Sequence, residues 1–347
     1  MYILVAIILF GLLIGIHEFG HFIAAKSVGV KVNEFSIGMG PALLKKQGRE
    51  TLYSLRALPV GGFCAMEGED EESESPRALK NQGFFKSFLI LFAGSGMNFV
   101  LGFLLVFIIF LNAGGYQTAK ITSFMENCPY ESEEAFRKND IIYSINSNRI
   151  YVFGNVSSYL KQGHGVYDVV VIRDGEKLEL RNLELKRLEY EDGHYYGFRF
   201  EEIESSPLKI LGHSFYTSLD FVREIWRALK EFIAGRLGFD MMAGPIYIVK
   251  VISDVGESSP TVSDALLNIL YLGAFISVNL AFMNLLPIPA LDGGRIFFLI
   301  VNALVSLVIG RKISSEYEKY IHAGGMVLLL IFMAVVMFFD LRRLIKL

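Results

Sequence analysis

A HExxH motif lies inside a run of residues that is long and apolar enough to cross a membrane. The motif, His17-Glu18-Phe19-Gly20-His21, interrupts an otherwise almost wholly apolar stretch from Tyr2 to Ala25. As a helix this stretch covers about 36 Å, which exceeds the ~30 Å hydrocarbon core of a bilayer. Each ionisable side chain inside a span costs roughly 2.5–3.5 kcal/mol or more, so these residues call for a functional explanation.

The spacing of the motif predicts a zinc site. His17 and His21 stand four residues apart, so a helix stacks their imidazoles on one face, where both can bind one Zn²⁺. Glu18 follows His17 and can act as the general base toward an attacking water. A cleaved signal peptide is the alternative. The run lacks the basic n-region and the small-residue cleavage site that such a peptide carries.

Composition indicates a few membrane spans together with one water-exposed domain. Of the 347 residues, 52% are hydrophobic and 20% are charged, too apolar for a soluble globule and too charged for a protein wholly inside the membrane. The net charge of −3 does not indicate a protein that binds nucleic acid. The two cysteines, Cys64 and Cys128, lie far apart, which excludes a disulfide framework or a C-x-x-C metal site. Any zinc must therefore use histidine and carboxylate ligands.

The pattern predicts a polytopic α-helical membrane protein with about four transmembrane helices. The candidate spans are Tyr2–Ala25, Phe88–Leu111, Ala265–Leu286 and His322–Phe339. The loop after the first span alternates weakly, which predicts a β-hairpin, and its many lysines and arginines predict a cytoplasmic location. The N-terminus and residues 112–264 then lie outside. The segment Ile296–Ile309 covers only about 22 Å and is predicted to be a buried or interfacial helix.

The water-exposed part covers residues 116–204. Short β-like runs such as Ile141–Ile145 alternate there with turn signals such as Asp174-Gly175, which predicts one small α+β domain. From Ile210 to Ile233 apolar residues recur at helical spacing. A helix lying on the membrane surface and a helix packed under the exposed domain both fit this pattern.

The end of the third span supplies a candidate for the third zinc ligand. Pro287 and Pro289 cannot continue a helix, so the backbone unwinds where the span ends. Unwound backbone at membrane depth is tolerated only inside protein or beside a wet cavity. Asp292 follows at once. It is either a helix N-cap at the membrane surface or the third ligand, and a HExxH pair without another candidate favours the ligand.

Together these motifs resemble the site-2 protease family of intramembrane zinc metalloproteases, in its regulator of sigma-E protease group. HEFGH is similar to the family's first-helix motif, and Asn284 to Gly293 matches its N-x-x-P-x-P-x-L-D-G signature at every fixed position. The run Ala93-Gly94-Ser95-Gly96-Met97-Asn98 resembles A-G-P-x-x-N, with Ser95 in place of proline. Residues 136–146 resemble a PDZ pattern, with Asn139 where glycine is usual.

The resemblance implies a complete site. Its metal ligands are His17, His21 and Asp292, its base is Glu18, its cofactor is Zn²⁺, and its substrate groove is lined by Asn284, Pro287 and Pro289. It also implies a cytoplasmic-side re-entrant β-hairpin that offers an edge strand to substrate, and an inserted PDZ-like extracytoplasmic domain. The parts are 1–113 (first membrane part), 114–205 (PDZ-like domain), 206–264 (amphipathic linker) and 265–347 (second membrane part).

The implied function is hydrolysis of a peptide bond within or near the transmembrane segment of a membrane protein. The expected partners are single-span substrates in the bacterial inner membrane, such as a pre-cleaved anti-sigma factor or a remnant signal peptide; the oligomeric state stays open. Two other classes of function, a scaffold and a transporter, are alternatives to a protease. A membrane-tethered scaffold without catalysis predicts a decayed metal motif, and a metal transporter predicts polar residues along several spans. Neither prediction fits this sequence.

Overall fold

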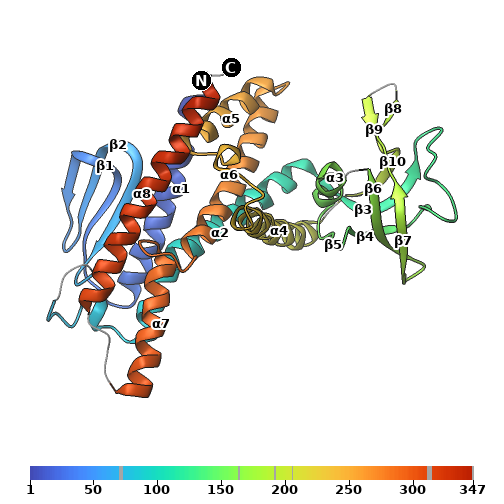
Figure 1. The fold of residues 1–347 in the computed structure, drawn as a ribbon. Helices are drawn as coiled ribbons and strands as arrows, with labels where there is room; N and C mark the ends of the chain where they lie inside the picture. Colours follow the sequence, from blue (N-terminus) through green and yellow to red (C-terminus); the bar gives the residue numbers. More distant parts are fainter. Residues whose placement is uncertain (70–72, 163–164, 191–192, 205, 311–314, 346–347) are drawn as a thin grey trace. The chain divides into compact units, whose positions relative to one another are not determined.

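The chain folds into two compact units, which are described separately. A computed structural model describes residues 1–69, 73–162, 165–190, 193–204, 206–310 and 315–345. The helical unit contains Met1–Leu105 and Phe221–Leu347, and the sheet unit contains Val106–Asp220. Figure 1 shows the helices of the first and the strands of the second.

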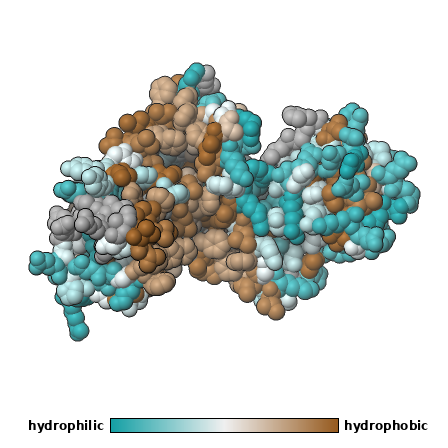
Figure 2. Space-filling view, turned by 60° about the horizontal axis from the view of Figure 1, so that its bottom comes forward, coloured by the Kyte–Doolittle hydropathy of each residue, from teal (hydrophilic) through white to brown (hydrophobic). Residues whose placement is uncertain are grey.

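Within the described residues, four helices are long and apolar enough to cross a membrane, which confirms the predicted number of spans. They are α1 (Tyr2–Ser27), α2 (Phe84–Ala113), α6 (Val262–Asn284) and α8 (Ser315–Ile345). The third span was expected to reach Leu286, but α6 ends at Asn284 because the two prolines that follow cannot continue it. Apolar residues gather over the surface of the helical unit, whereas the sheet unit presents mostly hydrophilic ones (Figure 2).

The predicted hairpin is present but curls back on itself. Strands β1 (Val32–Gln47) and β2 (Leu52–Met66) are antiparallel, and residues 34–37 of β1 pair with both 52–55 and 62–65 of β2. The first half of β1 therefore lies between the two halves of β2, and the four strand segments lie side by side in the order 62–65, 34–37, 52–55, 44–47. Glycines permit the bend: Gly38 has φ 86°, and a side chain there would meet the Leu58 carbonyl oxygen at 2.6 Å.

Helix α5 (Pro245–Ser258) packs against α1 and α6, and α7 (Asp292–Ile309) begins beside α1 at Asp292. Ile252 of α5 and Ile269 of α6 are buried in one cluster with residues of α1 such as Leu13. The first turn of α5 is capped from another helix, because the Asp340 carboxylate of α8 accepts from the backbone N–H groups of Gly244 and Tyr247, each at 3.1 Å.

The sheet unit is a small α+β fold, as predicted. Its main sheet has the order β10-β3-β4-β6-β7, with β5 pairing β4, and a separate pair β8-β9. Their bounds are β3 Gly115–Phe124, β4 Ile141–Ile145, β5 Asn148–Arg149, β6 Val166–Arg173, β7 Glu176–Glu184, β8 Leu188–Tyr190, β9 Gly193–Tyr195 and β10 Phe198–Glu204; helix α3 is Phe153–Gln162. The core beneath α3 contains Phe136, Ile145, Tyr167 and Val171.

Helix α4 (Pro207–Ile233) makes a contact that neither alternative drawn from the sequence included. Its second half packs on α6 of the helical unit, with Phe221 edge-on to the rings of Tyr271 and Phe275 at centroid distances of 5.5 and 5.3 Å. The apolar stripe of this half therefore faces another helix instead of serving only a membrane surface.

Candidate metal centre

The structure brings His17, His21 and Asp292 together at α1, a helix long and apolar enough to span a membrane. Both histidines point from one face of α1, and the aspartate is the first residue of α7. The three potential ligand atoms form a nearly equilateral triangle: His17 Nε2 to Asp292 Oδ2 is 3.2 Å, His21 Nε2 to Asp292 Oδ2 is 3.3 Å, and the two Nε2 atoms are 3.3 Å apart. Both histidines are buried, with 9% and 6% of their surface exposed.

These separations fit zinc. In a tetrahedral site with bonds of 2.0–2.1 Å, neighbouring ligand atoms are about 3.3 Å apart. His21 Nδ1 donates to the backbone carbonyl of Ile90 at 2.8 Å, so the neutral ring directs the Nε2 lone pair toward the centre of the triangle. Asp292 Oδ2 is buried and accepts no hydrogen bond from the described residues. Two imidazole nitrogens and one such oxygen are the donor set that a catalytic zinc uses.

The turn between α6 and α7 determines where Asp292 lies. The N-cap of α7 is Leu291, so Asp292 is in the first helical turn and is not the cap that the sequence left possible. A side chain at Gly293 would overlap the carbonyl of Leu285, and one at Gly294 would overlap that of Ile288. The two glycines therefore allow the unwound backbone to pass beneath the start of α7 and bring the carboxylate up to α1.

The last span holds this turn in place. The backbone N–H of Ala290, which has φ 76°, donates to His322 Nδ1 of α8 at 2.9 Å. Gly325 of α8 lies so close to Pro289 that a side chain at 325 would overlap the proline ring. The α8 helix thus supports the residues immediately before Asp292.

The other predicted site residues lie at different distances from the triad. Asn284 is adjacent, with its Nδ2 atom 3.5 Å from His17 Nε2. Glu18 is half-buried against the hairpin, where its Cγ lies 3.3 Å from the position that a Cβ at Gly62 would take. Pro289 packs on α8, whereas Pro287 is exposed.

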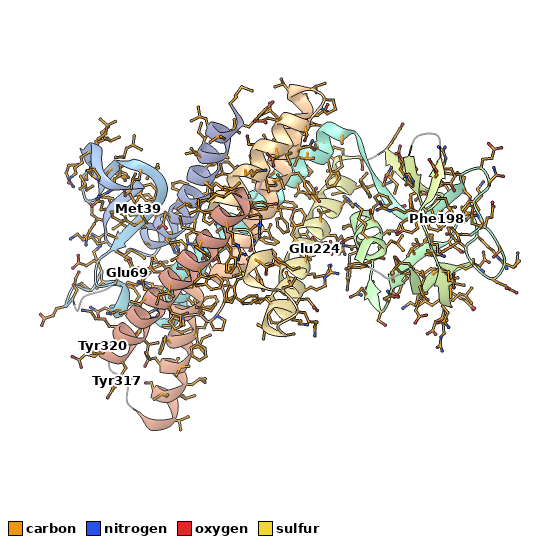
Figure 3. The ribbon with its side chains drawn as sticks, turned by 45° about the horizontal axis from the view of Figure 1, so that its top comes forward. Met39, Glu69, Phe198, Glu224, Tyr317 and Tyr320 are labelled. Carbon is orange, nitrogen blue, oxygen red and sulfur yellow. The ribbon has the colours of Figure 1, made fainter. Side chains whose placement is uncertain are left out.

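Sequence reasoning missed two supporting contacts. One is the Ile90 carbonyl that orients His21, for which an apolar residue in a span gives no signal. The other is the ion pair between Arg295 of α7 and Glu69, in the loop after β2 (Glu69 is labelled in Figure 3). Nothing in the sequence indicates that these two residues, more than two hundred positions apart, form a pair. Only the fold shows that they join the start of α7 to the end of the hairpin.

The chain is similar to known metalloproteases along nearly its whole length. Residues 5–332 match the model of a family described as peptidase family M50. A protein of Fusobacterium nucleatum named as a zinc metalloprotease is 31% identical, with 99% of each chain covered, and a similarly named protein of Clostridium perfringens is 33% identical, with 98% of each covered. The regulator of sigma-W protease RasP of Bacillus subtilis is 25% identical, with 97% of each covered. The chain therefore belongs to peptidase family M50, and it is a multi-pass inner-membrane zinc metalloprotease.

Proposed function

We propose that this protease cleaves a peptide bond within or near the transmembrane segment of its substrate, with His17, His21 and Asp292 as the zinc ligands and Glu18 as the general base. The observation that carries the proposal is the triangle of ligand atoms on a helix that is itself long and apolar enough to span. A site at that depth is reached most directly by a peptide that also lies in the membrane.

Each residue of the site has a distinct task in the hydrolysis. Zinc, when bound, supplies a Lewis acid that polarises the scissile carbonyl and activates water. The Glu18 carboxylate takes a proton from the attacking water and passes it to the leaving amine nitrogen as the C–N bond breaks. The products are a new carboxylate and a new amine. Asn284, beside His17, is positioned to donate a hydrogen bond from its amide to the substrate backbone.

The curled hairpin is proposed to be a re-entrant element that presents substrate to Glu18. Its exposed side chains include large apolar ones that water would not favour, among them Ile37, Met39, Leu43 and Leu58 (Met39 in Figure 3). Its closing half lies beside Glu18 at Gly62. A substrate strand added to this ribbon would regain the backbone hydrogen bonds that it loses when its helix unwinds.

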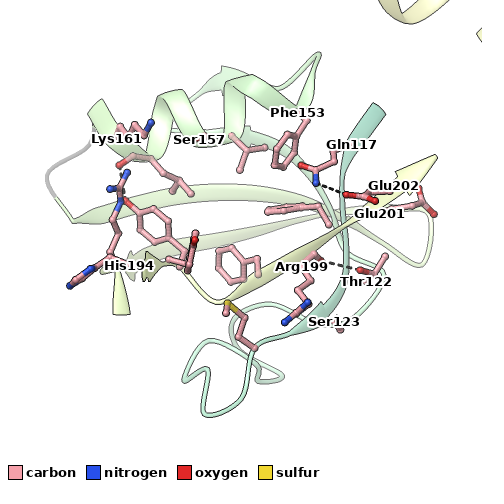
Figure 4. Close-up of a pocket in the computed structure, with 18 residues that line it drawn as sticks. Gln117, Thr122, Ser123, Phe153, Ser157, Lys161, His194, Arg199, Glu201 and Glu202 are labelled. Atoms are coloured by element: carbon pink, nitrogen blue, oxygen red, sulfur yellow. Dashed lines mark hydrogen bonds between the residues drawn. The ribbon is translucent and has the colours of Figure 1, made fainter. Parts of the chain in front are cut away.

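The sheet unit is proposed to be the PDZ-like module, either a filter that admits only short ectodomains or a site that captures peptide ends. A cavity of about 960 Å³ between α3 and β10 favours capture (Figure 4). Its apolar lining includes Phe153, Leu160 and Phe198, and the basic side chains of Lys161 and Arg199 also line it. β10 is the edge strand of the sheet, so its outer backbone groups are available for an added strand.

The substrate class is proposed from a relative's name. Because one relative is named as a regulator of sigma-W protease, we propose that the natural substrates are single-span proteins such as anti-sigma factors, with remnant signal peptides as the second candidate.

The test is cleavage of a labelled single-span substrate by the purified protein in detergent, with zinc measured in the same samples. We expect Glu18→Gln to retain zinc and to lose cleavage, whereas Glu126→Gln, an exposed carboxylate of the sheet unit, cleaves like the wild type. Appreciable cleavage by Glu18→Gln would remove Glu18 from the role of base. Loss of zinc from Glu18→Gln would make it part of the metal-binding set instead.

A further inference from the structure

An asparagine inside the second span has no hydrogen-bonding partner among the described residues. Asn98 of α2 is fully buried, and neither its Nδ2 nor its Oδ1 atom bonds to any part of the chain that the structure describes. A buried amide without partners is costly, more so in a helix surrounded by apolar neighbours. Its presence calls for a group that it binds.

The face of α2 that carries Asn98 is the face that supports the metal centre. Ile90 accepts from His21 Nδ1, and Gly94 lies so close to the His21 ring that no side chain fits there. Asn98 is four residues after Gly94, one turn or about 6 Å further along the same face. The two helices run antiparallel. Because Gly94 lies against His21, Asn98, one turn later on α2, lies beside the residue one turn earlier on α1, which is His17.

Further contacts agree with this alignment. Leu101 of α2 packs against the cluster that contains Leu9 and Leu13, which lie earlier in α1. The backbone of Asn98 is also fixed from a third helix, because Ser277 of α6 donates from its hydroxyl to the Asn98 carbonyl at 2.7 Å. The asparagine therefore lies where α1, α2 and α6 meet.

His17 also has a ring nitrogen without a hydrogen-bond partner among the described residues. Its Nδ1 atom is buried and has no hydrogen-bond partner in the described ranges, whereas the equivalent atom of His21 donates to a carbonyl. Histidines that bind a metal almost always donate the other ring N–H to an oxygen, which fixes the tautomer and the ring orientation. The Oδ1 atom of Asn98 is an oxygen of this kind at the right level of the helix pair.

We propose that Asn98 is a positioning residue for His17: in the zinc-bound protein its side-chain oxygen accepts the hydrogen bond that His17 Nδ1 donates. The inference rests on the proposed role of His17 as a zinc ligand. Asn98 does not touch zinc or substrate. It sets the direction of the Nε2 lone pair on the first histidine of the motif, as the Ile90 carbonyl does for the second.

The test compares zinc binding in the full-length protein in detergent. Asn98→Leu keeps the volume and removes the oxygen, Asn98→Ala removes it without adding bulk, and Asn98→Asp keeps it. Ser95→Ala is the matched control. The hydroxyl of Ser95 on α2 is also buried without a hydrogen-bond partner among the described residues. Unlike Asn98, Ser95 lines an apolar cavity together with Ala281 and Leu285 of α6. Zinc dissociation constants come from chelator competition, and the visible spectrum of the cobalt-substituted protein reports ligand geometry.

We expect Asn98→Leu and Asn98→Ala to bind zinc about 10- to 100-fold more weakly and to shift the cobalt spectrum. Asn98→Asp and Ser95→Ala should stay within about threefold of the wild type. Melting of the metal-free proteins separates these effects from misfolding, since Asn98→Leu removes an unpaired polar group and should not lower the metal-free melting temperature. Wild-type zinc affinity and spectrum in both Asn98→Leu and Asn98→Ala would overturn the proposal. Retention of zinc by His17→Ala would instead overturn the ligand set itself.

Discussion

A single methyl group at Gly94 should displace a proposed zinc ligand. A Cβ at this position would lie 2.7 Å from both Cδ2 and Cε1 of the His21 ring and closer still to Nε2. Carbon atoms in contact prefer 3.5–4.0 Å, so the ring would have to withdraw by about 0.8 Å or more. Metal sites tolerate about 0.2 Å, and a displacement near 1 Å costs on the order of 100-fold in function.

Gly94→Ala is therefore expected to weaken zinc binding and substrate cleavage by on the order of 100-fold. Gly15→Ala is the matched control, since it adds the same methyl group to α1, two residues before the motif, and a Cβ there has no neighbour within 4 Å. The assays are chelator competition for zinc and cleavage of a single-span substrate. If Gly94→Ala kept wild-type zinc affinity and cleavage, the inferred crowding of His21 by α2 would be wrong.

Three further predictions test other parts of the molecule. Asp292→Ala should abolish stoichiometric zinc by elemental analysis while the detergent-solubilised chain still elutes as a folded species; full metal occupancy would defeat the ligand assignment. Asp340→Ala should lower stability by about 1–3 kcal/mol, seen as a lower melting temperature, because two backbone N–H groups at the start of α5 lose their acceptor, and an unchanged melt would contradict this. Burial between aromatic rings lowers the pKa of His213 to about 4, so the unfolded state binds more protons below pH 6.5 and stability should fall as pH drops from 6.5 to 4. His213→Phe, which can still stack on Tyr116, should make the free energy of unfolding from urea titrations depend less on pH between 6.5 and 4. The same pH dependence in this variant as in the wild type would show that His213 is not responsible.

The membrane part was predictable because its signals are local. A helix converts the four-residue spacing of His17 and His21 into a shared face without help from the rest of the chain. The two prolines after Asn284 end α6 by sterics alone. Length and hydropathy together identified four spans.

The contacts that complete the site were not predictable, because they join residues far apart in sequence. A backbone carbonyl such as that of Ile90 is present at every residue, so nothing in the sequence distinguishes the one that orients His21. The hairpin curls because residues 34–37 of β1 pair with both halves of β2, and the weak alternation of the sequence does not indicate this double pairing. Nothing in the sequence connects Asp340 with α5, yet its carboxylate caps that helix almost a hundred residues earlier.

The turn before Asp292 contacts α8, so we expect proteolysis to require that helix. A chain synthesised only as far as α7 contains all three proposed ligands but lacks the contacts that α8 makes with the turn. In those contacts the His322 ring accepts a hydrogen bond from the Ala290 N–H, and Gly325 lies against Pro289. Asp292, at the start of α7, then follows a turn that α8 no longer holds. We therefore expect a chain whose synthesis has reached only α7 to lack protease activity until α8 has been added.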